Sequence, residues 1–195
     1  MRITGGTHKG QTVQTVKGQE VRPTSSKVRE SIFNIIQLNE SGTVFYEGET
    51  TVLDLFAGSG IMGLEALSRG ATRAVFVEKN PQHAAIIKKN ILNCHSENTK
   101  LIVADALKIL DKLDEKFNFI FVDPPYASGL YEPVLQKIHD NKILAEAGFI
   151  ILEYASNLNI PEIAEKSGFK TYRAKTYGDT GIAVLTENDS EFRSC

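Results

Sequence analysis

The chain has 195 residues, enough for one globular domain with a short extension and too few for two full domains. Hydrophobic residues make up 42% of the sequence and charged residues 24%, a composition able to bury a sizeable core. No apolar run approaches the roughly 18 residues that a membrane span requires. The first six residues also lack the apolar region of a signal peptide. Because two cysteines form neither a disulfide framework nor a metal cluster, we expect a cytoplasmic protein without a metal or membrane partner.

Charge is unevenly distributed along the chain. The net charge is −2, yet residues 1–31 carry six basic side chains against two acidic ones. A basic segment joined to an acidic remainder can mark contact with a polyanion such as RNA, although a solvated surface segment explains it equally well. The expected RNA-binding residues in this segment are Arg2, Lys9, Arg22, Lys27 and Arg29.

Residues 1–40 are predicted to form a small N-terminal extension. Residues 1–21 contain short β-pieces interrupted by glycines, and a helix is expected to start near Pro23 with apolar residues at helical spacing. Lys27 and Arg29 lie roughly 200° apart around that helix, so they cannot both face one partner surface.

Residues 41–195 alternate between strand and helix patterns. This alternation predicts βαβ units and a Rossmann-like α/β fold with a mostly parallel, doubly wound sheet. The two closing strands are joined by a short turn and must be antiparallel. The predicted strands span 51–56, 73–77, 100–104, 117–122, 149–152, 169–176 and 182–186, and the predicted helices span 60–69, 81–93, 105–113, 130–139 and 161–167.

Four consecutive strands end at an acidic residue. These residues are Asp54, Glu78, Asp105 and Asp123. Ligands of open α/β sheets bind outside the carboxyl ends of the strands, so the four carboxylates are expected to share one site. Taken alone, Asp105 fits the N-cap of a helix equally well.

A glycine-rich loop follows the first of these strands. Gly58, Gly60 and Gly63 form a G-x-G-x-x-G pattern between a strand and a helix, and Glu78 lies 20 residues after Gly58. The loop and the helix start offer N–H groups to an anion, and the acid can bind ribose hydroxyls. The pattern predicts a nucleoside-containing cofactor. Because the surrounding carboxylates would repel a pyrophosphate, the cationic S-adenosylmethionine is favoured over NAD.

The fourth strand is followed by Asp123-Pro124-Pro125-Tyr126. Two prolines make the segment stiff and extended. The Asp123 carboxylate and the Pro124 carbonyl could accept the hydrogens of an exocyclic amine and stabilise positive charge developing on its nitrogen. Tyr126 would stack on the base. The expected catalytic residues are Asp123, Pro124, Pro125 and Tyr126.

This tetrapeptide is similar to the (D/N/S)-P-P-(Y/F/W) motif of amino-directed nucleic-acid methyltransferases. Over nearly its full length the chain resembles the RsmD family, whose members methylate N2 of a guanine in 16S ribosomal RNA. One departure is Thr7-His8, where a more basic or aromatic pair is expected. The matching stretches are Gly5-Gly6, Lys9-Gly10, Arg22-Pro23-Thr24, Val28-Arg29-Glu30, Phe33-Asn34, residues 53–60 and 63–71, Glu78, Asn90, residues 123–126, Glu153 and Tyr177-Gly178.

The resemblance implies that residues 41–195 form an S-adenosylmethionine-dependent methyltransferase domain. It also implies a substrate of 16S ribosomal RNA within an assembled or late-precursor small subunit. Nothing in the sequence requires more than a monomer. The expected cofactor-binding residues are Asp54, Phe56, Gly58, Ser59, Gly60, Glu78, Lys79, Asp105 and Ala106.

Three other functions remain open at this point. An adenine-N6 methyltransferase could use the same acceptors, a nicotinamide-dependent oxidoreductase could use the glycine loop, and an RNA-binding assembly factor could keep the fold without activity. Arg22 could close the cofactor pocket instead of contacting RNA. His83 is most simply a helix-surface residue, and for Glu65 and Glu153 fold support is as plausible as cofactor contact.

Overall fold

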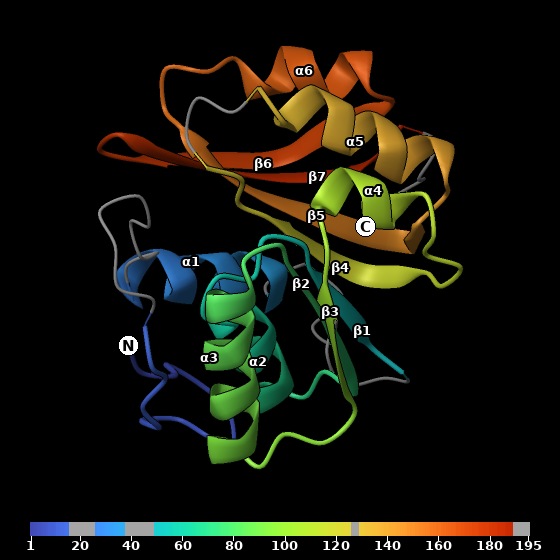
Figure 1. Cartoon of the computed structure of the whole chain (residues 1–195). Coiled ribbons are helices and arrows are strands. Elements are labelled where there is room, and N and C mark those ends of the chain that lie inside the picture. Colours follow the sequence, from blue (N-terminus) through green and yellow to red (C-terminus); the bar gives the residue numbers. More distant parts are fainter. Residues whose placement is uncertain (16–25, 38–48, 126–128, 189–195) are drawn as a thin grey trace.

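The computed structural model describes residues 1–15, 26–37, 49–125 and 129–188. These residues contain one sheet of seven strands, in the order β3-β2-β1-β4-β5-β7-β6, with helices on both faces (Figure 1). The strands are β1 (Thr51–Asp54), β2 (Arg73–Glu78), β3 (Thr99–Val103), β4 (Phe117–Val122), β5 (Leu144–Ala155), β6 (Phe169–Tyr177) and β7 (Thr180–Glu187). The helices are α1 (Ser26–Gln37), α2 (Ile61–Ser68), α3 (Pro81–Asn93), α4 (Ala106–Leu110), α5 (Tyr131–Asp140) and α6 (Ile160–Lys166).

The pairing confirms the predicted Rossmann-like sheet. β3, β2, β1, β4 and β5 run parallel to one another, whereas β7 pairs antiparallel with both β5 and β6. The chain reverses its direction across the sheet between β1 and β4. That reversal opens a crevice at the carboxyl ends of the two strands, where ligands of such sheets bind.

The two faces of the sheet carry separate hydrophobic cores. One core holds α1, α2 and α3 together with Ile3 and Val13 of the N-terminal segment, and the other holds α4, α5 and α6 (Figure 1). Alternate residues of each strand feed opposite faces, so Val52 of β1 enters the first core and Leu53 the second. The N-terminal segment, residues 1–15, therefore joins this core, where it packs on α2 and α3, and it forms an isolated bridge between Arg2 and Thr12. The domain boundary predicted at residue 40 lies outside the described residues.

Several predicted elements have different lengths in the structure. β5 spans twelve residues, whereas the sequence predicted only residues 149–152. Its first part pairs Leu144 with Phe117, after which the register shifts so that Phe149 pairs with Phe119. Ala147, with a φ of 56°, lies within this irregular stretch. The interruption hides the strand from a search for continuous alternation. At its other end β5 continues beyond Leu152 because it pairs with β7.

Two boundary residues behave as caps. α4 is shorter than its predicted range and begins after Asp105, whose carboxylate accepts hydrogen bonds from the N–H groups of Leu107 and Lys108. Gly60 lies before α2 with a φ of 78°, a left-handed conformation that favours glycine. In the described part of the chain, none of the helices combines the length and the apolar character needed to cross a membrane.

Candidate active site

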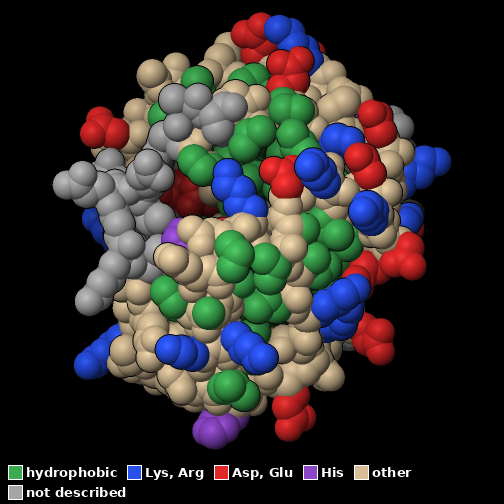
Figure 2. All heavy atoms as spheres, in the orientation of Figure 1, with side chains coloured by type: hydrophobic (Ala, Val, Ile, Leu, Met, Phe, Trp, Pro, Cys, Tyr) green, Lys and Arg blue, Asp and Glu red, His purple; other side chains and the backbone are tan. Residues whose placement is uncertain are grey.

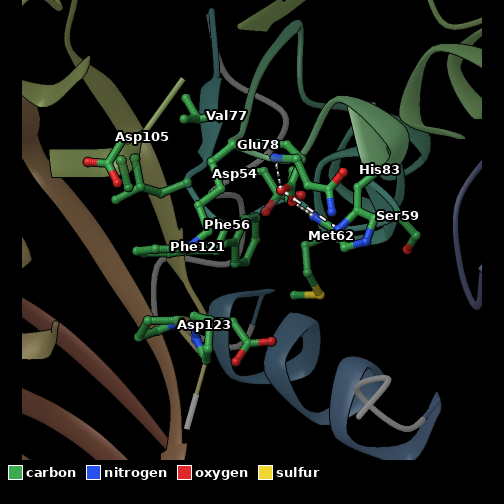
Figure 3. Close-up of a pocket in the computed structure, with 18 of the residues that line it drawn as sticks. Asp54, Phe56, Ser59, Met62, Val77, Glu78, His83, Asp105, Phe121 and Asp123 are labelled. Carbon is green, nitrogen blue, oxygen red and sulfur yellow. Dashed lines mark hydrogen bonds and ion pairs between the residues drawn. The ribbon is translucent and has the colours of Figure 1, made fainter. Parts of the chain in front are cut away.

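A cavity of about 300 Å³ lies at the carboxyl edge of the sheet. Asp54, Glu78, Asp105 and Asp123 all line it, so the structure brings the four predicted carboxylates to one site. Figure 2 shows a hollow on this face with acidic side chains at its base, and Figure 3 shows the residues around the cavity. The remaining wall is largely apolar and includes Phe56, Met62, Val77, Leu107 and Phe121.

Eight of the nine expected cofactor-binding residues line this cavity, and Gly60 does not. Gly60 instead supports the loop, because its N–H donates to the carbonyl of Ala57 at 2.6 Å. Gly63 also lies outside the cavity, and its role is to allow close packing of α2. A Cβ at this position would lie 2.3 Å from Cε1 of Phe76, so only glycine lets α2 pack this closely on β2.

Glu78 holds the glycine-rich loop in place. One carboxylate oxygen accepts the N–H of Gly58 at 2.9 Å, and the other accepts the N–H of Asn80 at 2.8 Å. Carboxylate oxygens have further lone pairs, so Glu78 can hold the loop and still bind hydroxyl groups of a ligand. His83 lies with Nδ1 3.7 Å from a Glu78 oxygen and lines the cavity, which corrects its interpretation as a helix-surface residue (Figure 3).

Asp54 is a buried carboxylate whose pKa lies well above its ordinary value. Its Oδ2 accepts the N–H of Gly63 at 3.0 Å. Burial raises the pKa of Asp54 to about 7, with a smaller contribution in the same direction from Glu78 and an opposing one from the Gly63 hydrogen bond. Burial disfavours the ionised carboxylate because the charge loses its surrounding water. A cationic ligand beside Asp54 would offset this cost and favour the ionised form.

Asp123 lies on the opposite side of the cavity from Glu78, and its carboxylate points towards α1 (Figure 3). Burial raises the pKa of Asp123 well above its usual range, and the negative charges of Glu153 and Asp54 raise it further. Pro124 and Pro125 line the same cavity, whereas the expected stacking residue Tyr126 lies outside the described residues.

The catalytic candidates Asp123, Pro124 and Pro125 thus line the same cavity as the cofactor candidates. Comparisons with known proteins show which family the chain resembles. Residues 1–186 match the model of a protein family described as "Conserved hypothetical protein 95". The chain is 37% identical to "Putative rRNA methyltransferase YlbH" of Bacillus subtilis, covering 94% of this chain and 97% of that protein. It is 31% identical to "Ribosomal RNA small subunit methyltransferase D" of Escherichia coli, covering 94% and 88% of the two chains.

The chain belongs to the RsmD family. Its fold is also similar to a solved structure, "Putative methyltransferase yhhF from Escherichia coli", with a TM-score of 0.80 and 29% identity over 96% of this chain and 97% of the other. The resemblance recognised in the sequence and the predicted fold are both confirmed.

Asn90, one of the residues that match the RsmD family pattern, connects the cofactor loop to the N-terminal segment. Its fully buried side chain donates to the carbonyls of Ser59 and Gln14 at 2.9 and 3.0 Å and accepts the N–H of Gln14 at 2.9 Å. Met1 of the same segment lines the cavity. The N-terminal segment is therefore part of the wall of the candidate site, whereas the sequence suggested a place beside the cofactor pocket only for Arg22.

The expected RNA-binding residues fall into different environments. Arg2, Lys9 and Lys27 are exposed, and Arg22 lies outside the described residues. The prediction for Arg29 is wrong in this structure because its side chain is fully buried. Its guanidinium donates to the carbonyl of Arg2 at 2.8 Å, which gives it a structural role. The opposite orientations of Lys27 and Arg29 agree with their spacing on the helix.

Glu153 lies near the catalytic motif, and the sequence left its role open between fold support and cofactor contact. It is buried on β5, and its charge raises the pKa of Asp123. A signal for it was present, because Glu153 directly follows the predicted strand 149–152 as Asp123 follows the predicted strand 117–122. Among the residues that the structure describes, no group of three or more His, Cys, Asp or Glu side chains could hold a metal ion.

Proposed function

We propose that this protein transfers a methyl group from S-adenosylmethionine to the exocyclic N2 amine of a guanine in 16S ribosomal RNA. The observation that supports the proposal most strongly is that Asp123, Pro124 and Pro125 line the same cavity as the glycine-rich loop and Glu78. One cavity therefore offers a place for a nucleoside cofactor next to hydrogen-bond acceptors for an amine. The relatives named as ribosomal RNA methyltransferases support RNA as the substrate.

The chemistry of the cavity wall fits S-adenosylmethionine. Four carboxylates and several apolar side chains surround the cavity, and this composition suits a cationic ligand with an adenine ring. Glu78 would bind the ribose hydroxyls, Asp54 would attract the cationic end, and the loop at Ser59, next to Gly58, would bind the carboxylate. Lys79, Asp105 and Ala106 lie on the same wall. When bound, this cofactor supplies an electrophilic methyl group on a sulfonium with a good leaving group.

Asp123 and Pro124 are proposed to prepare the amine. The lone pair of an exocyclic amine is delocalised into the base, which makes the nitrogen a poor nucleophile. Acceptors at the Asp123 carboxylate and the Pro124 carbonyl would hold the amine hydrogens and stabilise the positive charge that develops as the nitrogen forms its new bond. The rigid Pro-Pro segment keeps these acceptors aligned with the methyl group, and such alignment lowers the barrier.

The proposal is tested by methyl transfer to small ribosomal subunits from cells that lack this protein. Labelled S-adenosylmethionine is supplied, naked ribosomal RNA and DNA are assayed in parallel, and the product nucleosides are identified. We expect N2-methylguanosine, formed mainly on subunits. N6-methyladenine would overturn the proposed base and support the same acceptors acting on adenine. Absence of transfer to every substrate despite cofactor binding would contradict an enzymatic role.

The pKa of Asp54 predicts how cofactor binding depends on pH. Between pH 7.5 and pH 6 the ionised fraction of a carboxyl with a pKa of about 7 falls by nearly tenfold. If the ionised form attracts the cationic cofactor, the dissociation constant rises by a similar factor, about tenfold, as the pH is lowered. Isothermal titration across this range measures the effect.

Asp54→Asn is the matched variant for this measurement, because its amide oxygen can still accept the Gly63 N–H. It should bind the cofactor weakly and with little pH dependence. A wild-type affinity that stays constant between pH 7.5 and pH 6 would contradict the assignment of Asp54 as the group that attracts the cofactor's positive charge.

A further inference from the structure

β6 is a basic strand at one end of the sheet. Among the described strands it pairs only with β7, and its outer edge carries no partner strand (Figure 1). The nine residues Phe-Lys-Thr-Tyr-Arg-Ala-Lys-Thr-Tyr include three basic side chains, two tyrosines and no acidic residue. Arg173 and Lys175 are exposed. This pattern combines positive charge with aromatic rings on an accessible surface.

The register of β6 against β7 places its functional groups on one face. Arg173 lies opposite Val184 and Lys175 opposite Ile182, and both β7 residues enter the core on the α1 side of the sheet. Directly paired residues point to the same face, so Arg173 and Lys175 lie on the α1 side as well. Tyr177 confirms this orientation because its hydroxyl hydrogen-bonds to Ser31 of α1.

The register across the sheet also places Lys175 level with the catalytic motif. Val122 pairs with Leu152, and Leu152 pairs with Ala183. The next residues towards the carboxyl edge are Asp123 after β4 and Glu153 on β5. Glu153 pairs with Ile182 of β7, and Ile182 pairs with Lys175 of β6, so Lys175 is level with Asp123. Three strand spacings separate β4 from β6, about 14 Å in total. A few nucleotides of single-stranded RNA can span this distance.

The two cations are available to a ligand. Neither Arg173 nor Lys175 forms an ion pair with any residue that the structure describes, unlike Arg73, Lys137 and Lys166, which are paired with acids. Instead, the Arg173 guanidinium lies 5.9 Å from the ring centroid of Tyr172, and the Lys175 ammonium lies 5.1 Å from that of Tyr177. These contacts hold the cations in position without neutralising their charge.

We propose that β6 binds the RNA backbone beside the active site, with Arg173 and Lys175 contacting phosphates of nucleotides that flank the methylated base. This inference rests on the proposed function, since it assumes an RNA substrate at Asp123. Charged edge strands also prevent pairing between molecules, but charge on either face would serve that purpose. RNA contact explains why both cations lie on the α1 face of the sheet. Lys175 is level with the catalytic motif, and Arg173 lies two residues before it on β6.

The test compares two double variants that remove equal charge. Arg173→Gln/Lys175→Gln changes the proposed surface. Lys112→Gln/Lys116→Gln changes two exposed lysines in the segment before β4, which lies at the amino ends of the strands, away from the cavity. The affinity of each purified protein for small ribosomal subunits from cells that lack this protein is measured over a range of salt concentrations. The apparent KM for RNA, kcat, cofactor affinity and melting temperature are measured as well.

We expect the β6 variant to lose RNA affinity and the control to retain it. Loss of two phosphate contacts should reduce the slope of log affinity against log salt by about 1.4–1.8 and raise KM for RNA, with kcat and cofactor affinity unchanged. If the β6 variant matches the control while the wild type binds and methylates RNA, the inference is overturned and the proposed function stands. If the wild type neither binds nor methylates these subunits, the proposed function fails and the inference fails with it.

Discussion

Asp123→Ala is expected to lower kcat for methyl transfer by about 10²–10³-fold, the usual cost of removing one group that stabilises charge in the transition state. Asp123 lines the cavity opposite Glu78 and is proposed to hold the amine of the substrate. Cofactor affinity should change little, because Gly58 and Glu78 are untouched. Steady-state kinetics and isothermal titration together separate the two effects. Activity within threefold of the wild type would contradict the proposed role of Asp123.

Asp123→Asn is the companion variant, because it keeps an oxygen acceptor and removes the charge. We expect it to retain more activity than the alanine variant. It should also be more stable than the wild type at alkaline pH. The folded-state pKa of Asp123 is raised well above its unfolded value, mainly by burial. The native state therefore binds this proton more tightly than the unfolded state does.

The sign of the pH effect follows from this difference in proton binding. The stability contributed by protonated Asp123 is fully present below the unfolded pKa of about 4 and is lost as the pH rises through the folded pKa. Asp123→Asn removes that loss, so its melting temperature relative to the wild type should be higher at pH 8 than at pH 5. If the melting temperatures of the variant and the wild type differ by the same amount at both pH values, ionisation of Asp123 is not the cause of the difference in stability.

A gain in stability together with a loss of activity would show why the carboxylates are clustered. Asp54 and Glu153 are buried and Asp123 is half-buried, and both Asp54 and Glu153 raise the pKa of Asp123. Such a cluster costs folding free energy, because buried like charges are poorly solvated. Sites that keep groups of this kind are candidates for binding or catalysis.

The parts of the site that were predictable from the sequence are those with a local signal. Asp54 and Glu78 each end a strand whose apolar pattern is visible over a few residues, and the glycines at 58, 60 and 63 mark the turn between them. Parallel strands bring their carboxyl ends to one edge, so local patterns were sufficient to place these residues together. The same reasoning places Asp123 after β4.

The parts that were not predictable depend on contacts between distant segments. Arg29 appears in the sequence as one of several basic residues near the N-terminus, and only its packing beside Glu65 shows that it is buried. Met1 reaches the cavity because residues 1–15 pack on α2 and α3, more than 60 residues away in sequence. No short-range periodicity encodes these contacts.

Glu65 is the centre of those contacts, and its replacement should have the largest effect on stability. Its side chain is fully buried on α2 and accepts the N–H of Thr4 at 2.9 and 3.1 Å and the Thr4 hydroxyl at 2.5 Å. Arg69 donates to it at 3.0 Å, and the Arg29 guanidinium lies 3.9 Å away. Burial lowers the pKa of Arg29, whereas the charge of Glu65 raises it and so favours the charged form.

Glu65→Ala should therefore lower the free energy of unfolding by about 3–5 kcal/mol, because removing one member of a buried ion pair leaves the other charge uncompensated. Denaturant titration measures this loss. Glu146→Ala removes an exposed carboxylate and should change stability by no more than about 0.5 kcal/mol. A loss at Glu65 as small as that of the control would contradict the central role of this contact.

The same substitution separates a purely structural anchor from one that also shapes the cofactor site. Thr4 is three residues from Met1, whose amino group donates to the Val13 carbonyl at 2.8 Å and whose side chain lines the cavity. If Glu65 positions this wall, Glu65→Ala should weaken cofactor binding under conditions where the protein is still folded, and the Thr4 amide should exchange faster with solvent. Unchanged cofactor affinity with rapid exchange at Thr4 would show that the N-terminal segment stabilises the fold without contributing to the site.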